Sequence, residues 1–462
     1  MKPLFKYYYL TIVALTGLTS CDDNLDLVPE QSLDPETATS SPANIQNLLI
    51  GAYDLAGSNV LFSGDTQLAS ELLANDNRIE NENLLGELAW RGTFQGPAEF
   101  NRKQMTAQNA FVVPYWTQGY ATINQTNLVL DNLDIITDPE TAAILEGEAK
   151  FLRALVYFEL VRHFGLPYET GQTNAQLGVP IVTNAVTDAS QIEFPSRNSV
   201  EEVYTQLITD LQDAYNLLPD ENSFFADRYA AQAILARIYL QQGNYVAARD
   251  AADDVLNNSG HSLTASYEDA FNNDEDSTED IFAWQITTQD GINDYNTFWA
   301  TRDFGGRSLT GDITIEAPYF ELFDDPNDER STFFYEGNGT LASGKWQSQF
   351  ANVPFLRLAE MHLIRAECNF REGSNIGLSP LEEINALRAR SNASALGALD
   401  LEEILRERKR ELGFEGFALH DLKRTKQDVA GIPYNADELV MPIPQREIDA
   451  NPNLVQNPGY VN

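Results

Sequence analysis

The segment YAAQAILARIYLQQGNYVAARDAADDVLN, residues 229–257, indicates how this chain folds. Apolar residues recur with a helical period over 229–242 and again over 245–257. Six residues stand at the spacings of a tetratricopeptide unit: Leu235, Ala236, Tyr239, Gly243, Tyr245 and Ala248. In such a unit, small residues let two antiparallel helices approach closely, while Tyr and Leu fill the groove between them. The segment therefore predicts a hairpin of two closely packed helices.

Helical periodicity continues over most of the chain from Ile45 onward. It predicts further helices over 115–133, 142–164, 200–217, 356–372, 381–390 and 401–412. Residues 152–158 and 364–370 echo the first helix of the repeat, although the units are scattered and not tandem. We expect a mainly α protein of tetratricopeptide-like helical pairs, which would bind partners through an extended surface. A generic bundle of helical hairpins remains the alternative.

Two regions break the helical pattern. The first is an insertion over about 260–354, which mixes glycines with three of the five tryptophans, Trp284, Trp299 and Trp346. The second spans residues 57–102 and contains Trp90. Long irregular segments on a rigid scaffold often form binding surfaces, so we expect some of these rings to contact a ligand. The alternative for any single ring is that it packs the segment onto the helices.

The N-terminus predicts a lipid anchor. Lys2 and Lys6 precede an apolar run over 7–17, which is too short to span a bilayer, and LTSC (18–21) resembles the lipobox of bacterial lipoproteins. We expect residues 1–20 to be a signal peptide, Cys21 to be acylated, and residues 21–40 to form a tether. The acidic DDNLD (22–26) resembles the surface-export signals of Bacteroidota lipoproteins. An ordinary secretory peptide is the alternative.

Composition excludes several classes of function. A formal net charge of −39 is incompatible with nucleic-acid binding, which needs an excess of Lys and Arg on one face. No nucleophile elbow, P-loop or zinc-protease motif is present, and the four histidines are far apart in sequence, so we expect no catalytic residue, metal or cofactor. Two acidic runs, 274–276 and 324–328, could hold calcium, but neither fits the EF-hand pattern, and a solvated loop is the alternative. Cys368 lies on an apolar helical row and is expected to be buried.

Several motifs resemble the SusD/RagB family of surface nutrient-binding lipoproteins. They are ERKRELGFEG (407–416) with DLKR (421–424), YATINQTN (120–127), EAKFLRA (148–154) with FGLP (164–167), and the proline-rich ending MPIPQREIDANPNLVQNPGY (441–460). Within 401–412 we expect the pairs Glu402–Arg406 and Glu407–Arg410 to line a solvated helix face. Together with the lipobox, the resemblance covers essentially the whole chain, with residues 41–462 as the helical domain.

The resemblance implies a partner and a ligand. Such a protein would cap a SusC-like TonB-dependent transporter on the extracellular side of the outer membrane and pass it oligosaccharides, or in some branches peptides. A scaffold that contacts only proteins is a further alternative. The matching motifs are structural, so only the type of ligand residue carries over: aromatic rings with carboxylates and other polar groups. The candidate ligand-binding residues are Asp76, Trp90, Tyr295, Trp299, Arg302 and Trp346.

Overall fold

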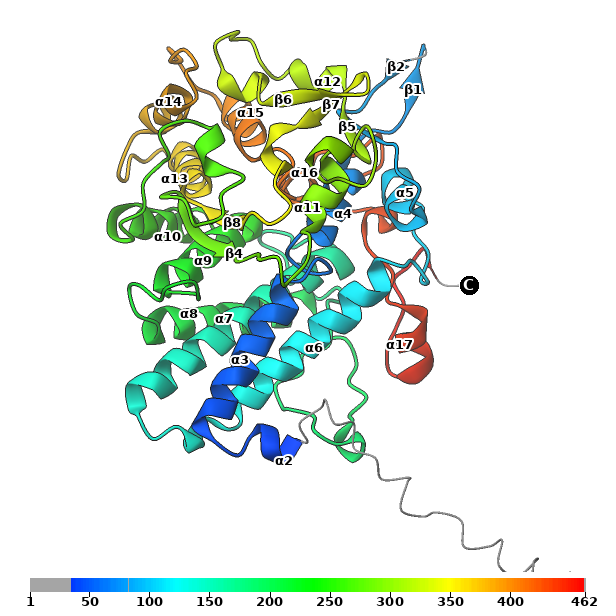
Figure 1. Ribbon diagram of the computed structural model, residues 1–462, viewed down its shortest axis with the longest axis vertical. Helices are drawn as coiled ribbons and strands as arrows, with labels where there is room; N and C mark the ends of the chain where they lie inside the picture. Colours follow the sequence, from blue (N-terminus) through cyan, green and yellow to red (C-terminus); the bar gives the residue numbers. More distant parts are fainter. Residues whose placement is uncertain (1–34, 82, 461–462) are drawn as a thin grey trace, which may run out of the picture.

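The structure is a computed structural model that describes residues 35–81 and 83–460. The predicted signal peptide, the acylated Cys21 and most of the predicted tether lie outside these residues. Long helices fill one end of the molecule, and a small sheet with short helices fills the other (Figure 1). No helix in the described part of the chain is long and apolar enough to cross a membrane.

The helices confirm the mainly α prediction. The predicted ones are α6 (Val112–Leu130), α7 (Pro139–Phe164), α8 (Val200–Leu217), α9 (Arg228–Gln242), α10 (Tyr245–Asn258), α13 (Leu358–Glu372), α14 (Pro380–Arg390) and α15 (Leu401–Leu412). The others are α2 (Pro35–Ala38), α3 (Pro42–Gly57), α4 (Asp65–Ala74), α5 (Gln95–Arg102), α11 (Asp294–Trp299), α12 (Ala317–Phe320), α16 (Ala418–Arg424) and α17 (Gln445–Ala450). The segment 441–460 contains no long helix, as its four prolines predict.

The pair α9 and α10 forms the predicted hairpin. The Asp227 side chain caps α9 by accepting a hydrogen bond from the Ala230 N–H, and Gly243 ends the helix in the left-handed conformation, with φ 72°. Ala236 and Ala248 are fully buried in the hairpin. Small residues therefore allow the close approach of the two helices that the repeat spacing indicates.

Region 57–102 is less irregular than predicted, because it contains α4 and α5. The helix α4 buries four polar side chains, Thr66, Gln67, Ser70 and Glu71, so its sequence lacks a clear apolar stripe. Ser70 and Glu71 find hydrogen-bond partners inside the protein: the Ser70 hydroxyl donates to the Thr66 carbonyl, and Glu71 accepts from the Gly416 N–H at 2.8 Å. A helix of this kind escapes detection by hydrophobic periodicity.

The insertion carries most of the strands. A four-stranded antiparallel sheet has the order β3-β5-β7-β6, with β3 at Leu88–Trp90, β5 at Ile313–Ile315, β6 at Phe334–Gly337 and β7 at Thr340–Ser343. A second antiparallel pair joins β4 (Asp280–Trp284) to β8 (Val353–Arg357), and β1 (Ile79–Glu80) pairs with β2 (Asn83–Leu84) as a small hairpin. Because β3 belongs to the second loop-rich region, the sheet fastens that region to the insertion.

The motif over 407–416 forms a buried network of ion pairs. Arg357 contacts Glu411 at 3.2 Å and Glu415 at 2.8 Å, and Arg330 contacts Glu407 at 2.9 Å. These contacts attach the insertion to α15 and the turn that follows it. The predicted exposed pair Glu402–Arg406 is confirmed at 3.1 Å. The prediction that Glu407 and Arg410 face solvent is wrong, because both side chains are buried against the insertion.

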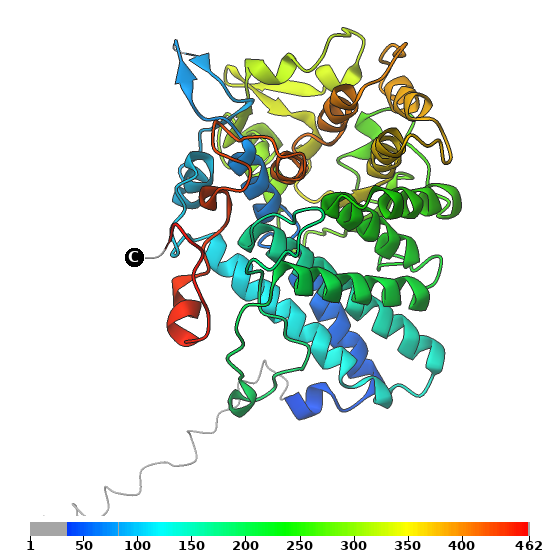
Figure 2. The ribbon, with the colours of Figure 1, turned by 180° about the vertical axis from the view of Figure 1, so that it is seen from behind.

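The C-terminal segment runs along the side of the helical body (Figure 2). The Met441 N–H donates to the His163 carbonyl at 2.8 Å, and the Gln445 N–H donates to the Ala107 carbonyl at 2.9 Å. The Cys368 side chain is buried within α13, as its apolar row predicts. The C-terminal segment and Cys368 therefore both pack against the helical body.

Candidate functional site

Three of the predicted ligand residues belong to the core. Trp299 is 1% exposed, Tyr295 is 3% exposed and Trp346 is 5% exposed. Tyr295 and Trp346 stack on each other, with ring centroids 3.9 Å apart. A ring whose faces are covered by protein cannot stack on a ligand, so the structure does not place these three candidate residues on an accessible surface.

The physical reason is that the insertion packs onto the turn after α15. The Trp346 indole N–H donates to the Phe414 carbonyl at 3.2 Å, and the Trp299 ring lies 5.2 Å from the Phe414 ring. Lys345, next to Trp346, donates to the Gly413 carbonyl at 2.8 Å. Trp299 and Trp346 thus pack against the 407–416 motif, which agrees with the alternative considered for each ring.

The rings near β3 are accessible instead. Trp90 is partly buried, and Phe94, four residues later, is 44% exposed. Both pack against the buried Phe298 of α11, with ring centroids at 6.2 and 6.1 Å. The position of Trp90 requires a glycine at 92, because a Cβ there would lie 2.4 Å from the Trp90 ring. The pairing of β3 with β5 and the packing on Phe298 therefore hold these two rings in place.

An arginine of the insertion lies beside these rings. The Arg307 guanidinium lies 3.9 Å from the centroid of the Phe94 ring, and its Nη2 donates to the Thr93 hydroxyl at 3.1 Å. Arg302 is exposed, and on the same loop Phe304 is 42% exposed. We call Trp90, Phe94, Arg302, Phe304 and Arg307 the aromatic–arginine surface.

Asp312 anchors the Arg307 side chain. This carboxylate is buried and pairs with Arg307, and its backbone carbonyl accepts from the Arg91 N–H at 2.7 Å. Burial raises the pKa of Asp312, and the Arg307 guanidinium acts in the opposite direction. Arg307 is therefore held in place at its Asp312 end while the face of its guanidinium covers Phe94.

Asp76 lies at the base of the β1–β2 hairpin, where it accepts hydrogen bonds from Arg78. These bonds hold the pKa of Asp76 below its usual value, so the carboxylate stays ionised at neutral pH. The pair is solvent-accessible, with Arg78 the more exposed partner. Its contact with a ligand stays a prediction.

The aromatic–arginine surface offers the contacts that a polyhydroxylated ligand needs. The axial C–H face of a pyranose is apolar and slightly positive, so an aromatic face attracts it, while guanidinium groups donate to its hydroxyls. Sequence reasoning placed Trp90 and Arg302 here but did not select Phe94, Phe304 or Arg307. The available signal was the cluster of Phe304 and Arg307 around Gly305-Gly306, close in sequence to Arg302.

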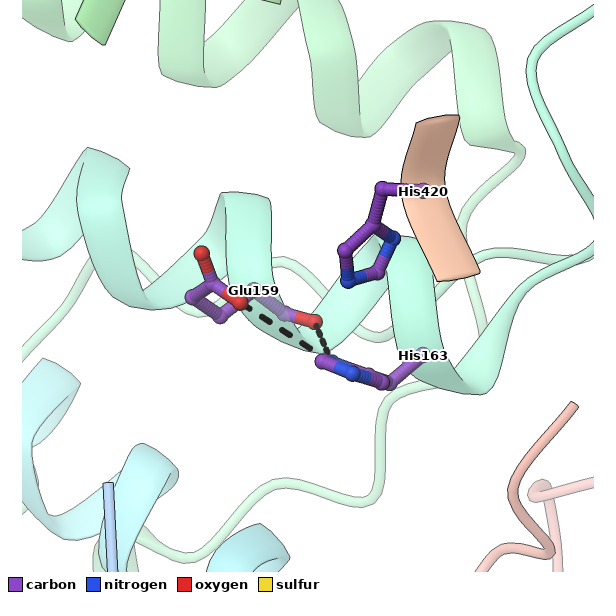
Figure 3. Close-up of side chains that lie close together, drawn as sticks. All are labelled: Glu159, His163 and His420. Carbon is purple, nitrogen blue, oxygen red and sulfur yellow. Dashed lines mark hydrogen bonds and ion pairs between the residues drawn. The ribbon is translucent and has the colours of Figure 1, made fainter. Parts of the chain in front are cut away.

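One buried cluster could be considered for a metal. The possible ligand atoms of Glu159, His163 and His420 lie within 4.8 Å of one another, so these histidines are not isolated in space as their sequence spacing suggested (Figure 3). Hydrogen bonds engage both ring nitrogens of His163 and the Nε2 atom of His420: the Ser70 hydroxyl lies 2.9 Å from His163 Nε2 and 3.2 Å from His420 Nε2. The Tyr115 hydroxyl lies 2.9 Å from His163 Nδ1.

Charge also disfavours a cation in this cluster. Burial lowers the pKa of both histidines well below the usual value, and the nearby positive charges of Arg162 and Lys423 lower it further. The Glu159 carboxylate is engaged by Arg162, whose Nε donates at 2.9 Å. We interpret the cluster as a buried polar contact that joins α4, α6, α7 and α16.

The acidic runs considered for calcium have internal partners. Asp276 accepts hydrogen bonds from Gln285 and Asn352, each at 2.8 Å. Asp328 pairs with the buried Arg330 at 2.8 Å. Both carboxylates are therefore engaged by protein partners, and Asp328 is buried, so it does not belong to a solvated loop.

Comparison with known proteins agrees with this architecture. A family model described as "Starch-binding associating with outer membrane" matches residues 23–240, and the SusD family model matches residues 196–439 and 425–460. The fold and these matches define a helical-repeat protein of the tetratricopeptide-like class. The chain belongs to the SusD family, also known as SusD/RagB.

Individual relatives cover nearly the whole chain. The SusD-like protein P2 of Formosa agariphila is 28% identical over 98% of this chain and 100% of its own length. The starch-binding protein SusD of Bacteroides thetaiotaomicron is 24% identical over 100% of this chain and 99% of its own. Among solved structures, a putative sugar binding protein of Bacteroides vulgatus superposes with a TM-score of 0.80 at 28% identity, covering 94% of this chain and 100% of that one.

Proposed function

We propose that this protein is a surface lipoprotein that captures oligosaccharides and delivers them to a SusC-like TonB-dependent transporter in the outer membrane. Membership of the SusD family and relatives named for starch and sugar binding support the ligand class. The accessible aromatic–arginine surface is the observation that links the proposal to particular residues. The lipobox at Cys21 supports attachment to the membrane, and no catalytic residue is proposed.

The chemistry of the surface supports modest affinity. Each exposed stacking contact contributes about 1 kcal/mol, so Trp90, Phe304 and the part of the Phe94 ring that Arg307 leaves uncovered together suit a ligand of several sugar units. Arg302 and Arg307 supply donors for hydroxyl or acidic groups at the edges of the rings. A peptide with aromatic and acidic side chains could use the same groups and is therefore included in the test.

The experiment is a binding screen on the soluble domain, residues 35–462, against an array of glycans and a set of peptides. For the best ligand, Phe94→Ala and Trp90→Ala should each weaken binding by about tenfold. Phe224→Ala is the matched control, because Phe224 is an exposed ring, 60% accessible, between α8 and α9. Unchanged affinity in both surface variants, or an equal loss of affinity in the control variant, would show that this surface is not the binding site. Binding to peptides alone would contradict oligosaccharides as the ligand class.

A further inference from the structure

A second concave site lies away from these rings. It is a pocket of about 250 Å³ between α4, α12, α15 and α16, closed on one side by the start of β3. Its wall is mainly apolar and includes Leu88, Tyr319, Leu405, Leu412, Phe417 and Leu422. An apolar cavity of about 150 Å³ accommodates benzene, so this pocket can hold a ring with a short substituent.

One guanidinium in the pocket lining lacks a full set of partners. Arg408 is 3% exposed, and its Nε donates to Asp421 at 2.8 Å while its Nη2 lies 3.5 Å from Glu360. Its Nη1 is buried and has no hydrogen-bond partner in the described part of the chain. An unpaired buried donor carries a desolvation penalty that an acceptor would remove.

The ion pairs around Arg408 carry an excess of positive charge. Arginines and carboxylates alternate along one continuous series of contacts, buried except at Asp421 and Arg371: Arg237, Glu360, Arg408, Asp421, Arg424, Glu367 and Arg371. Four guanidiniums thus meet three carboxylates, so the series carries a net charge of +1 although each guanidinium has a carboxylate partner in it. This local excess occurs in a protein whose net charge is −39.

The rest of the lining does not cancel this charge. Lys409 pairs with Glu87 at 2.5 Å and Arg406 pairs with Glu402 at 3.1 Å, so these groups balance each other. Burial raises the pKa of Glu71 to about 7, and this carboxyl therefore imposes less than a full negative charge near neutral pH. With Glu71 uncharged, three lining carboxylates face three lining cations, so what the pocket lacks is an acceptor for Arg408 Nη1, and a carboxylate is the strongest such acceptor.

We propose that this pocket binds a small monoanion with an apolar body, such as an aryl or branched alkyl carboxylate. The carboxylate accepts a hydrogen bond from Arg408 Nη1, and the apolar body packs against Leu88, Leu412 and Phe417. An oligosaccharide does not fit, because its hydroxyls would lose water against an apolar wall. The site is independent of the aromatic–arginine surface and of the function proposed for it.

The test compares two probes of the same shape, 4-phenylbutyrate and the neutral 4-phenylbutan-1-ol, by titration calorimetry with the soluble domain. The acid should bind at least about tenfold more tightly than the alcohol. Leu405→Trp should abolish binding of both, because Leu405 lines the pocket and is only partly buried. Val246→Trp, on the exposed face of α10, should leave binding unchanged.

Arg408→Lys keeps the charge but removes the Nη1 donor, so it should reduce the preference for the acid without affecting the alcohol. If this variant does not fold, the comparison of acid and alcohol on the wild-type protein and the Leu405→Trp variant still test the proposal. Equal affinity for acid and alcohol, no binding of either, or undiminished acid binding by folded Leu405→Trp would each overturn the proposal.

Discussion

Replacing Trp299 by Ala separates core from surface more clearly than any other single change. The side chain is 1% exposed and packs on Phe414, so its truncation should cost about 3–5 kcal/mol of unfolding free energy. Unfolding entropy is about 2.1 cal/mol/K per residue, which for the roughly 430 described residues gives about 0.9 kcal/mol/K. The melting temperature should therefore fall by about 3–6 °C.

The assay is calorimetric melting of the soluble domain, with oligosaccharide affinity measured on the same samples at 25 °C. At that temperature the variant stays folded, and its affinity should match that of the wild type. Phe224→Ala serves as the control for removal of an exposed ring and should shift the melting temperature by less than about 1 °C. A Trp299→Ala protein with an unchanged melting temperature and weakened binding would refute the assignment of this ring to the core.

Three further predictions follow from other parts of the structure. Ala236→Asp should lower the unfolding free energy, measured by urea denaturation, by about 3 kcal/mol or more, because it buries an unpaired charge between α9 and its neighbours. Val246→Asp, at an exposed position of α10, should leave the unfolding free energy nearly unchanged. Burial lowers the pKa of His420, so below about pH 6.5 the unfolded state binds more protons than the folded state, and the free energy of unfolding decreases as the pH falls. His420→Gln should reduce the slope of this pH dependence by up to about 1.4 kcal/mol per pH unit. An unchanged slope would show that His420 does not change its protonation on unfolding. Cys21→Ala should release the folded protein from washed membranes of cells that lack the transporter, and retention there would contradict the lipid anchor.

Helical periodicity predicted the scaffold because most of its helices bury a recurring apolar face. The bounds of α8 and α15 agree with the predicted 200–217 and 401–412. The method failed for α4, where Ser70 and Glu71 are buried and satisfied by partners from distant segments. It also failed for Glu407, since a charged residue beside Arg410 is typical of a solvated face until the insertion covers it.

The candidate site was predicted in part. Trp90 and Arg302 lie on an accessible surface, whereas Trp299 and Trp346 fill the core. An aromatic residue in an irregular segment has the same local sequence signal in both cases. The difference arises from tertiary packing on Phe414, far along the chain, which no local pattern encodes. The same limit explains why the contact between His163 and His420 was not foreseen.

The most direct test of the account is a map of where an oligosaccharide binds. Hydrogen–deuterium exchange of the soluble domain should be measured with and without the best ligand from the glycan screen. We predict that bound ligand slows exchange in peptides that cover residues 90–94 and 302–309, the two segments that carry the aromatic–arginine surface. Slowed exchange confined to the helical pair α9 and α10, or no change at residues 90–94 and 302–309 at saturating ligand, would contradict it.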